Sequence, residues 1–182
     1  MKKFQVGDTV VKPGLGLCKI KGLQKMEIDG SECELYVLQA GDVKVMVPLS
    51  AAHSGGLRAP MDSEQAEQVL GIVAEPIYLE EDEDELSGTY DIDVDDAREH
   101  LKRREPLALA KIVRSLFNKG KMVELSKHES EIYSQCMNML GDELAHLEHT
   151  TRMKMTHRMR SLLNEARKQR KSKFESPLAP RG

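Results

Sequence analysis

Short β-rich runs separated by turn residues fill the first sixty positions of the chain. The runs combine Val, Ile, Leu, Thr and Tyr, which fit the pleated surface of a strand. They cover residues 9–11, 17–20, 35–38 and 43–47. Asp29-Gly30 has the form of a two-residue hairpin turn, because Asp-Gly supplies the positive φ angles that such turns need. The pattern predicts a small β-barrel filled by its own side chains, which suits docking better than catalysis.

Apolar residues recur at helical spacing in the rest of the chain. Asp62 or Ser63 can cap a helix whose apolar residues include Ala66 and Val73. Further helices are expected to begin near residues 93, 106, 126 and 152, where acidic residues, Pro106, a capping box and an amphipathic run mark the starts. The predicted fold class is therefore α+β, with a small barrel and a following helix ahead of an all-α helical part.

The net charge of −3 is distributed unevenly along the chain. Residues 75–96 contain 11 Asp and Glu and no Lys or Arg, whereas residues 151–182 contain 10 Lys and Arg against two Glu. A run of like charges repels itself and stays solvated, so the acidic stretch is predicted to be a linker. These changes divide the chain into a barrel domain (1–74), an acidic linker (75–96), a helical domain (97–150) and a basic C-terminal helix and tail (151–182).

Cysteine usage and hydropathy indicate a cytoplasmic protein. The three cysteines are widely spaced and form no C-x-x-C motif, which is typical of free thiols in a reducing compartment. The first residues lack the apolar stretch of a signal peptide, and no apolar run reaches the length of a membrane span. We therefore expect a cytoplasmic monomer with no membrane contact.

The order of these segments, together with their sequences, resembles the CarD/CdnL family of bacterial transcription regulators. In the barrel the resemblance rests on Val6-Gly7-Asp8-Thr9-Val10-Val11, on the Asp29-Gly30 turn and on Met46-Val47-Pro48. In the helical domain it rests on residues 110–116 and on the stretch from 125 to 145. The order and spacing of these segments together are what make the resemblance specific.

The resemblance implies that the barrel is Tudor-like, as in transcription-repair coupling factors, and that it binds the β subunit of RNA polymerase. It also implies that the helical domain reaches the upstream edge of the melted promoter. There a family tryptophan wedges into the minor groove and basic residues hold the DNA backbone, so the bubble recloses less readily. We therefore expect a transcription regulator that stabilises the promoter open complex, with no enzyme chemistry and no cofactor.

The candidate polymerase-binding residues lie in the barrel. Met46, Val47 and Pro48 match the polymerase-contacting strand of the family, and Met26 falls beside the hairpin turn at another contact position. An apolar and adaptable Met side chain suits a docking edge. In the alternative interpretation, Met46 is buried inside the barrel.

The DNA-binding half departs from the family pattern. A gapless count from Val113 places Tyr90 where the family has its tryptophan, and the following positions are acidic instead of basic. Carboxylates repel phosphates, which supply most of non-specific DNA affinity. Tyr90 is either a wedge or an ordinary linker tyrosine, and the basic last helix either contacts DNA or folds back on the acidic linker. The remaining candidate DNA-binding residues are Lys102, Arg103, Arg104, Arg158 and Arg160.

Neither a catalytic site nor a metal site is predicted from the chain. Glu143, His146 and His149 recur about one helical turn apart, but no second cluster completes a metal site. His53-Ser54 lacks the acidic third member of a catalytic triad. An enzyme is therefore not expected. The alternative to a DNA-contacting regulator is an adaptor that binds RNA polymerase through the same barrel and carries another protein on its helical domain.

Overall fold

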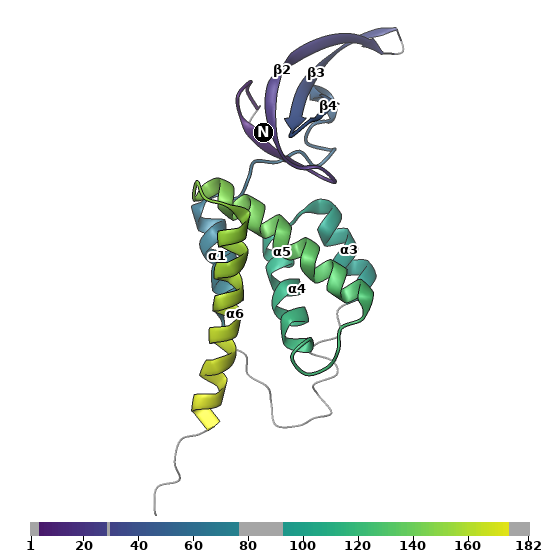
Figure 1. Ribbon diagram of the computed structural model, residues 1–182. Helices are drawn as coiled ribbons and strands as arrows, with labels where there is room; N and C mark the ends of the chain where they lie inside the picture. Colours follow the sequence, from purple (N-terminus) through teal and green to yellow (C-terminus); the bar gives the residue numbers. More distant parts are fainter. Residues whose placement is uncertain (1–3, 29, 77–92, 175–182) are drawn as a thin grey trace, which may run out of the picture. The chain divides into compact units, whose positions relative to one another are not determined.

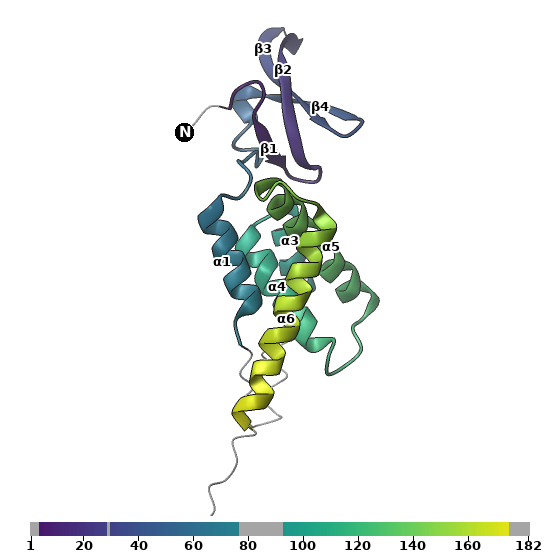
Figure 2. The same ribbon diagram turned by 60° about the vertical axis from the view of Figure 1, so that its left-hand side comes forward.

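The computed structural model describes residues 4–28, 30–76 and 93–174, and the chain forms two compact units that divide after Met61 (Figures 1 and 2). The first unit contains one antiparallel sheet with the strand order β1-β2-β3-β4, which curls into a half-barrel. Its elements are β1 (Thr9–Lys12), β2 (Gly16–Ile28), β3 (Ser31–Ala40), β4 (Val43–Pro48) and a short 3-10 helix, η1 (Leu49–Ala51). A curled sheet followed by helices confirms the predicted α+β class.

One face of the curled sheet holds the core of the first unit. Tyr36 of β3 pairs with Val47 of β4, so these two side chains leave the sheet on the same face. Tyr36, Leu38 and Ile20 are buried in one cluster, against which Val47 and Phe4 pack. The Tyr36 hydroxyl also donates a hydrogen bond to the Phe4 carbonyl at 3.1 Å. The core therefore depends on alternate residues of β3, as a period of two requires.

The β2–β3 hairpin is longer than the sequence predicted. The expected runs stop at residue 20 and resume at residue 35, whereas the ladder continues to the pair Ile28 and Ser31. Lys25 and Glu32 form a cross-strand ion pair of 2.9 Å in this outer part, with both side chains more than half exposed. Because both faces of this part meet water, its strands lack the apolar alternation by which a half-buried strand is recognised.

The second unit is all-helical within the described residues. It contains α1 (Ser63–Ala74), α3 (Val94–Arg103), α4 (Pro106–Lys119), α5 (Lys127–Leu147) and α6 (Arg152–Phe174). The predicted starts are confirmed: Asp62 accepts from the Gln65 amide at 2.9 Å, and Ser126 and Glu129 form a capping box. None of the described helices is both long enough and apolar enough to cross a membrane.

Both α1 and α6 are integral parts of this helical unit. The apolar stripe of α1, with Val69 and Val73 fully buried, packs against α4 and α6 (Figures 1 and 2). Arg114 of α4 fixes the end of α1 through the Glu75 carboxylate at 2.9 Å and the Pro76 carbonyl at 3.0 Å. The sequence-based division at residue 74 placed α1 with the barrel, whereas the compact units divide after Met61 because these contacts are with helices.

Candidate functional site

An apolar surface covers the side of the sheet opposite the core. Register places Val37 of β3 beside Met46 of β4, and Leu35 beside Pro48. On the other flank of β3, Cys33 pairs with Met26 of β2. Side chains that pair across an antiparallel ladder lie on one face, so these residues form one surface. We call it the Met46 face; its members are Met26, Cys33, Leu35, Val37, Met46 and Pro48.

The two methionines are the accessible part of the Met46 face. Met26 is 41% exposed and Met46 is 37% exposed, whereas Leu35 and Val37 between them are buried. Met46 therefore lies outside the core cluster, on the opposite side of the sheet from Tyr36. Exposed, flexible thioethers over a buried aliphatic base form a surface that can adapt to a partner.

The edge of the sheet adjoins the same surface. β4 pairs with β3 on one side and is the last strand of the described sheet. An edge strand leaves backbone donors and acceptors available to a further strand. Val47, the fourth polymerase-binding candidate, directs its side chain to the core face and packs against the core cluster. The structure thus places Met26, Met46 and Pro48 on one face of the sheet and directs the Val47 side chain to the other face.

The basic candidates at the end of α3 are exposed and paired with carboxylates. Lys102 lies 2.6 Å from Glu99, and Arg103 lies 3.9 Å from Glu105. The Lys102 ammonium also lowers the pKa of the Glu99 carboxyl. Surface pairs of this kind contribute little to stability, so phosphates can compete for these cations. Arg104 differs, because it ends α3 in the left-handed conformation (φ 53°) and donates its backbone N–H to the His100 carbonyl.

The two α6 candidates point to different sides of their helix. Arg158 and Arg160 are two positions apart, which corresponds to about 200° around an α-helix. The Arg158 guanidinium lies 2.7 Å from Glu148, whereas Arg160 lies near Tyr133 of α5. The buried Met159 between them belongs to the core stripe of α6. The two arginines therefore flank the buried stripe and do not form one cluster.

Three sequence candidates remain: Tyr90, the histidine and glutamate set near the end of α5, and His53. Tyr90 and most of the acidic stretch lie outside the described residues. Of the histidine and glutamate set, Glu143 is buried while His146 and His149 are exposed, and nowhere in the described part do three potential metal ligands come together. His53 stacks on Phe4 with ring centroids 5.5 Å apart, which gives it a packing role.

Family comparisons fit this arrangement. The family model of the CarD-like/TRCF RID domain matches residues 4–60, and that of the CarD C-terminal domain matches residues 77–168. The chain belongs to the CarD-like family. The first match ends beside the boundary after Met61, and α1 lies between the two matched ranges. The CarD-like protein is therefore an RNA polymerase-interacting transcription regulator, of a family that is regulatory and non-enzymatic.

Sequence reasoning missed Leu35 and Val37 as parts of this surface. The run Leu35-Tyr36-Val37-Leu38 is apolar throughout, so alternation could not show which residues face the core. The signal that finds them is the register of the Asp29-Gly30 hairpin, which fixes the face of each residue from the turn as far as the register shift between Ile20 and Gly22. With that register, Met26 and Cys33 share a face, and Leu35 and Val37 follow by alternation.

Proposed function

We propose that this CarD-like protein binds the β subunit of RNA polymerase through the Met46 face and the adjoining β4 edge. The observation that carries the proposal is an accessible Met46 beside an unpaired strand edge, within the segment that matches the family's interaction domain. The apolar surface has a polar rim, because register places three polar side chains on the same side of the sheet: Gln24, Gln39 and Lys44. An apolar centre with a polar rim is the usual composition of a protein interface.

The binding test is capture of the purified β-subunit lobe by the full-length chain. Met46→Glu should weaken binding at least about tenfold, because a carboxylate would lose its water without gaining a partner. Leu23→Glu is the matched control, since Leu23 is 53% exposed on β2 but pairs with Tyr36 and so lies on the other face. Equal loss of binding in both variants, or no loss in either, would refute the assignment of the surface.

The helical unit is proposed to stabilise the open promoter complex by contact with DNA near the upstream edge of the bubble. Lys102 and Arg103 supply exposed cations on α3, and Arg158 supplies one on α6. Each phosphate contact adds about 0.9 to the slope of log affinity against log salt. DNA binding should therefore weaken steeply with salt, and Lys102→Glu with Arg103→Glu should lower both the affinity and that slope.

The lifetime of open complexes separates this proposal from the adaptor alternative. The wild-type protein should lengthen the lifetime, and Tyr90→Ala with the α3 charge reversals should shorten it again. Removing residues 151–182 is not a clean test, because Met155, Met159 and Leu163 of α6 are buried in the helical unit. An unchanged lifetime in the presence of measurable polymerase binding would favour an adaptor that does not touch DNA.

A further inference from the structure

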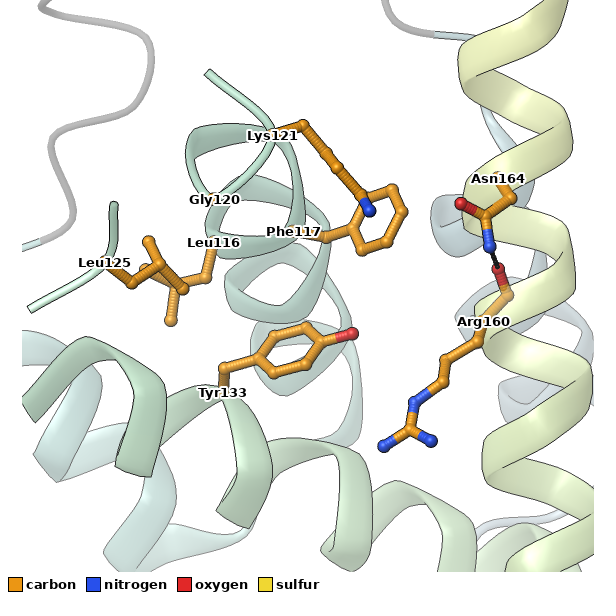
Figure 3. A pocket seen from close by; sticks show the side chains of 8 residues that line it. All are labelled: Leu116, Phe117, Gly120, Lys121, Leu125, Tyr133, Arg160 and Asn164. Carbon is orange, nitrogen blue, oxygen red and sulfur yellow. Dashed lines mark hydrogen bonds between the residues drawn. The ribbon is translucent and has the colours of Figure 1, made fainter. Parts of the chain in front are cut away.

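A hollow between α4, α5 and α6 has no part in the functions proposed above. Its volume is about 320 Å³. Its apolar lining comes from Leu116 and Phe117 of α4, from Leu125 of the loop that follows, and from the ring of Tyr133 on α5. Figure 3 shows the Phe117 and Tyr133 rings beside the open space, with Arg160 of α6 across from them. The hollow thus combines aliphatic and aromatic walls within one helical unit.

The polar groups around the hollow are cationic or can donate hydrogen bonds. Lys121 and Arg160 carry positive charge, Asn164 contributes an amide, and no carboxylate of the described residues lines the hollow. The Lys121 ammonium lies 5.2 Å from the centroid of the Phe117 ring. Burial raises the pKa of the Tyr133 hydroxyl, against a smaller opposing effect of Arg160, so this group remains an O–H donor at neutral pH. Such a lining favours a ligand with both an apolar group and negative charge.

The loop beside the hollow exposes further apolar surface. Met122 is 51% exposed and Val123 is 56% exposed, directly after Lys121 in the sequence. Adjacent apolar side chains at this level of exposure indicate a protein interface, in which aromatic residues, Met and Arg are enriched. A nucleic-acid ligand fits less well, because the exposed Met122 and Val123 side chains beside the hollow cannot bind phosphates.

We propose that this hollow docks an acidic peptide segment of another protein. The segment inserts one bulky apolar side chain against Phe117 and Tyr133, and its carboxylates pair with Lys121 and Arg160. The choice of occupant rests on charge complementarity, since the described lining offers cations and hydrogen-bond donors but no carboxylate. The site lies wholly on the helical unit, so it goes beyond the polymerase-binding surface and does not depend on it.

The test is a selection of peptides from a random phage-displayed library on the immobilised full-length chain. The expected result is a consensus with acidic residues around one aromatic or large aliphatic residue. The consensus peptide is then synthesised with a fluorophore and titrated by fluorescence anisotropy. Arg160→Glu should weaken its binding about tenfold or more, because an attractive charge pair becomes repulsive.

Lys154→Glu is the matched control for this measurement. It makes the same charge change on the same helix, at an exposed position that does not line the hollow. Its affinity should stay within about twofold of the wild type. Lys121→Glu provides a second variant outside the helices, and it should weaken binding without loss of helical structure because Lys121 lines the hollow after the end of α4.

Four results would each overturn the proposal. The first is a selection that yields no acidic consensus. The second is an equal loss of affinity in Lys154→Glu and Arg160→Glu. The third is displacement of the peptide by single-stranded DNA at equal concentration, which would assign the hollow to nucleic acid. The fourth is binding that tightens about tenfold when residues 80–85 are replaced by Gln and Asn, which would show that the chain's own acidic run occupies the site.

Discussion

Glu129 connects the end of α4 to the start of α5 and should control the acid stability of the helical unit. Its carboxylate lies 2.8 Å from the Lys119 ammonium of α4 and accepts the Ser126 backbone N–H at 2.8 Å. The side chain of Glu129 is 12% exposed and that of Lys119 is 25% exposed, so solvent screens the pair weakly. The hydrogen bond from Lys119, followed by those from Ser126, lowers the pKa of Glu129 from 4.5 to about 2.

The sign and size of the effect follow from this pKa. A carboxyl whose pKa is depressed by folding stabilises the folded state above its unfolded-state pKa and loses that contribution as the pH falls through the folded value. The window therefore extends from about pH 5 down to about pH 2. The pKa difference corresponds to about 3 kcal/mol of unfolding free energy at most. Few single groups in a protein of this size contribute as much.

Glu129→Gln tests the charge while keeping the cap, because Gln also serves at this position of a capping box. Urea unfolding followed by far-UV circular dichroism reports the helical unit, which holds the described α-helices. At pH 7 the variant should lose about 1–3 kcal/mol, and the loss should vanish towards pH 2. Glu131→Gln is the control, since Glu131 is 52% exposed on the same helix and should change stability by less than about 0.5 kcal/mol. A Glu129→Gln variant that retains the wild-type pH dependence would refute the reasoning.

Glycines and cysteines provide further checks on the packing. Gly141→Ala should lower the unfolding free energy by about 1–3 kcal/mol, because its Cβ would lie 2.8 Å from Thr156 Cγ2 where α5 meets α6. Gly71→Ala in α1 should raise it by up to about 1 kcal/mol, because nothing lies within 4 Å and Ala favours the helix. Ellman's reagent should modify the native chain first at Cys33, while burial raises the pKa of the Cys136 thiol to about 12 and keeps it unreactive. Equal labelling rates of Cys33 and Cys136, measured by mass spectrometry, would contradict this description. The same change in unfolding free energy for Gly141→Ala and Gly71→Ala would contradict it as well.

Local signals in the sequence were sufficient to locate the helices. Asp62 and Ser126 satisfy backbone donors within three residues, so their effect depends on neighbours that the sequence displays directly. Pro106 begins α4 and Gly120 follows its end, and these two signals also depend only on residues at the ends of the helix. The buried stripe of α6, with Met155, Met159 and Leu163, likewise follows from a period of 3.6 residues.

The surfaces that carry function depend on contacts between distant residues and were harder to predict. A helical period shows that α1 buries one face, but it does not show that α4 and α6 cover that face. The hollow joins Phe117, Tyr133 and Arg160, which are separated by 16 and 27 positions in the sequence. No local sequence pattern within its own helix marks any of these residues as part of a binding site. Only the packing of three helices brings two rings and a cation around one space.

The charges of α3 illustrate why charge pattern alone does not identify a DNA-binding helix. Asp93 caps α3 by accepting the Asp95 N–H at 2.9 Å, and Asp95 and Asp96 lie in its first turn. These positions are ones where the family resemblance led us to expect basic residues. Lys102 and Arg103 lie in its last turn, so the acids and the cations both match the helix dipole. Because folding alone accounts for this distribution, the basic end of α3 supports DNA contact only if its cations leave Glu99 and Glu105 for phosphate. Salt-dependent binding of the Lys102 and Arg103 variants measures that exchange directly.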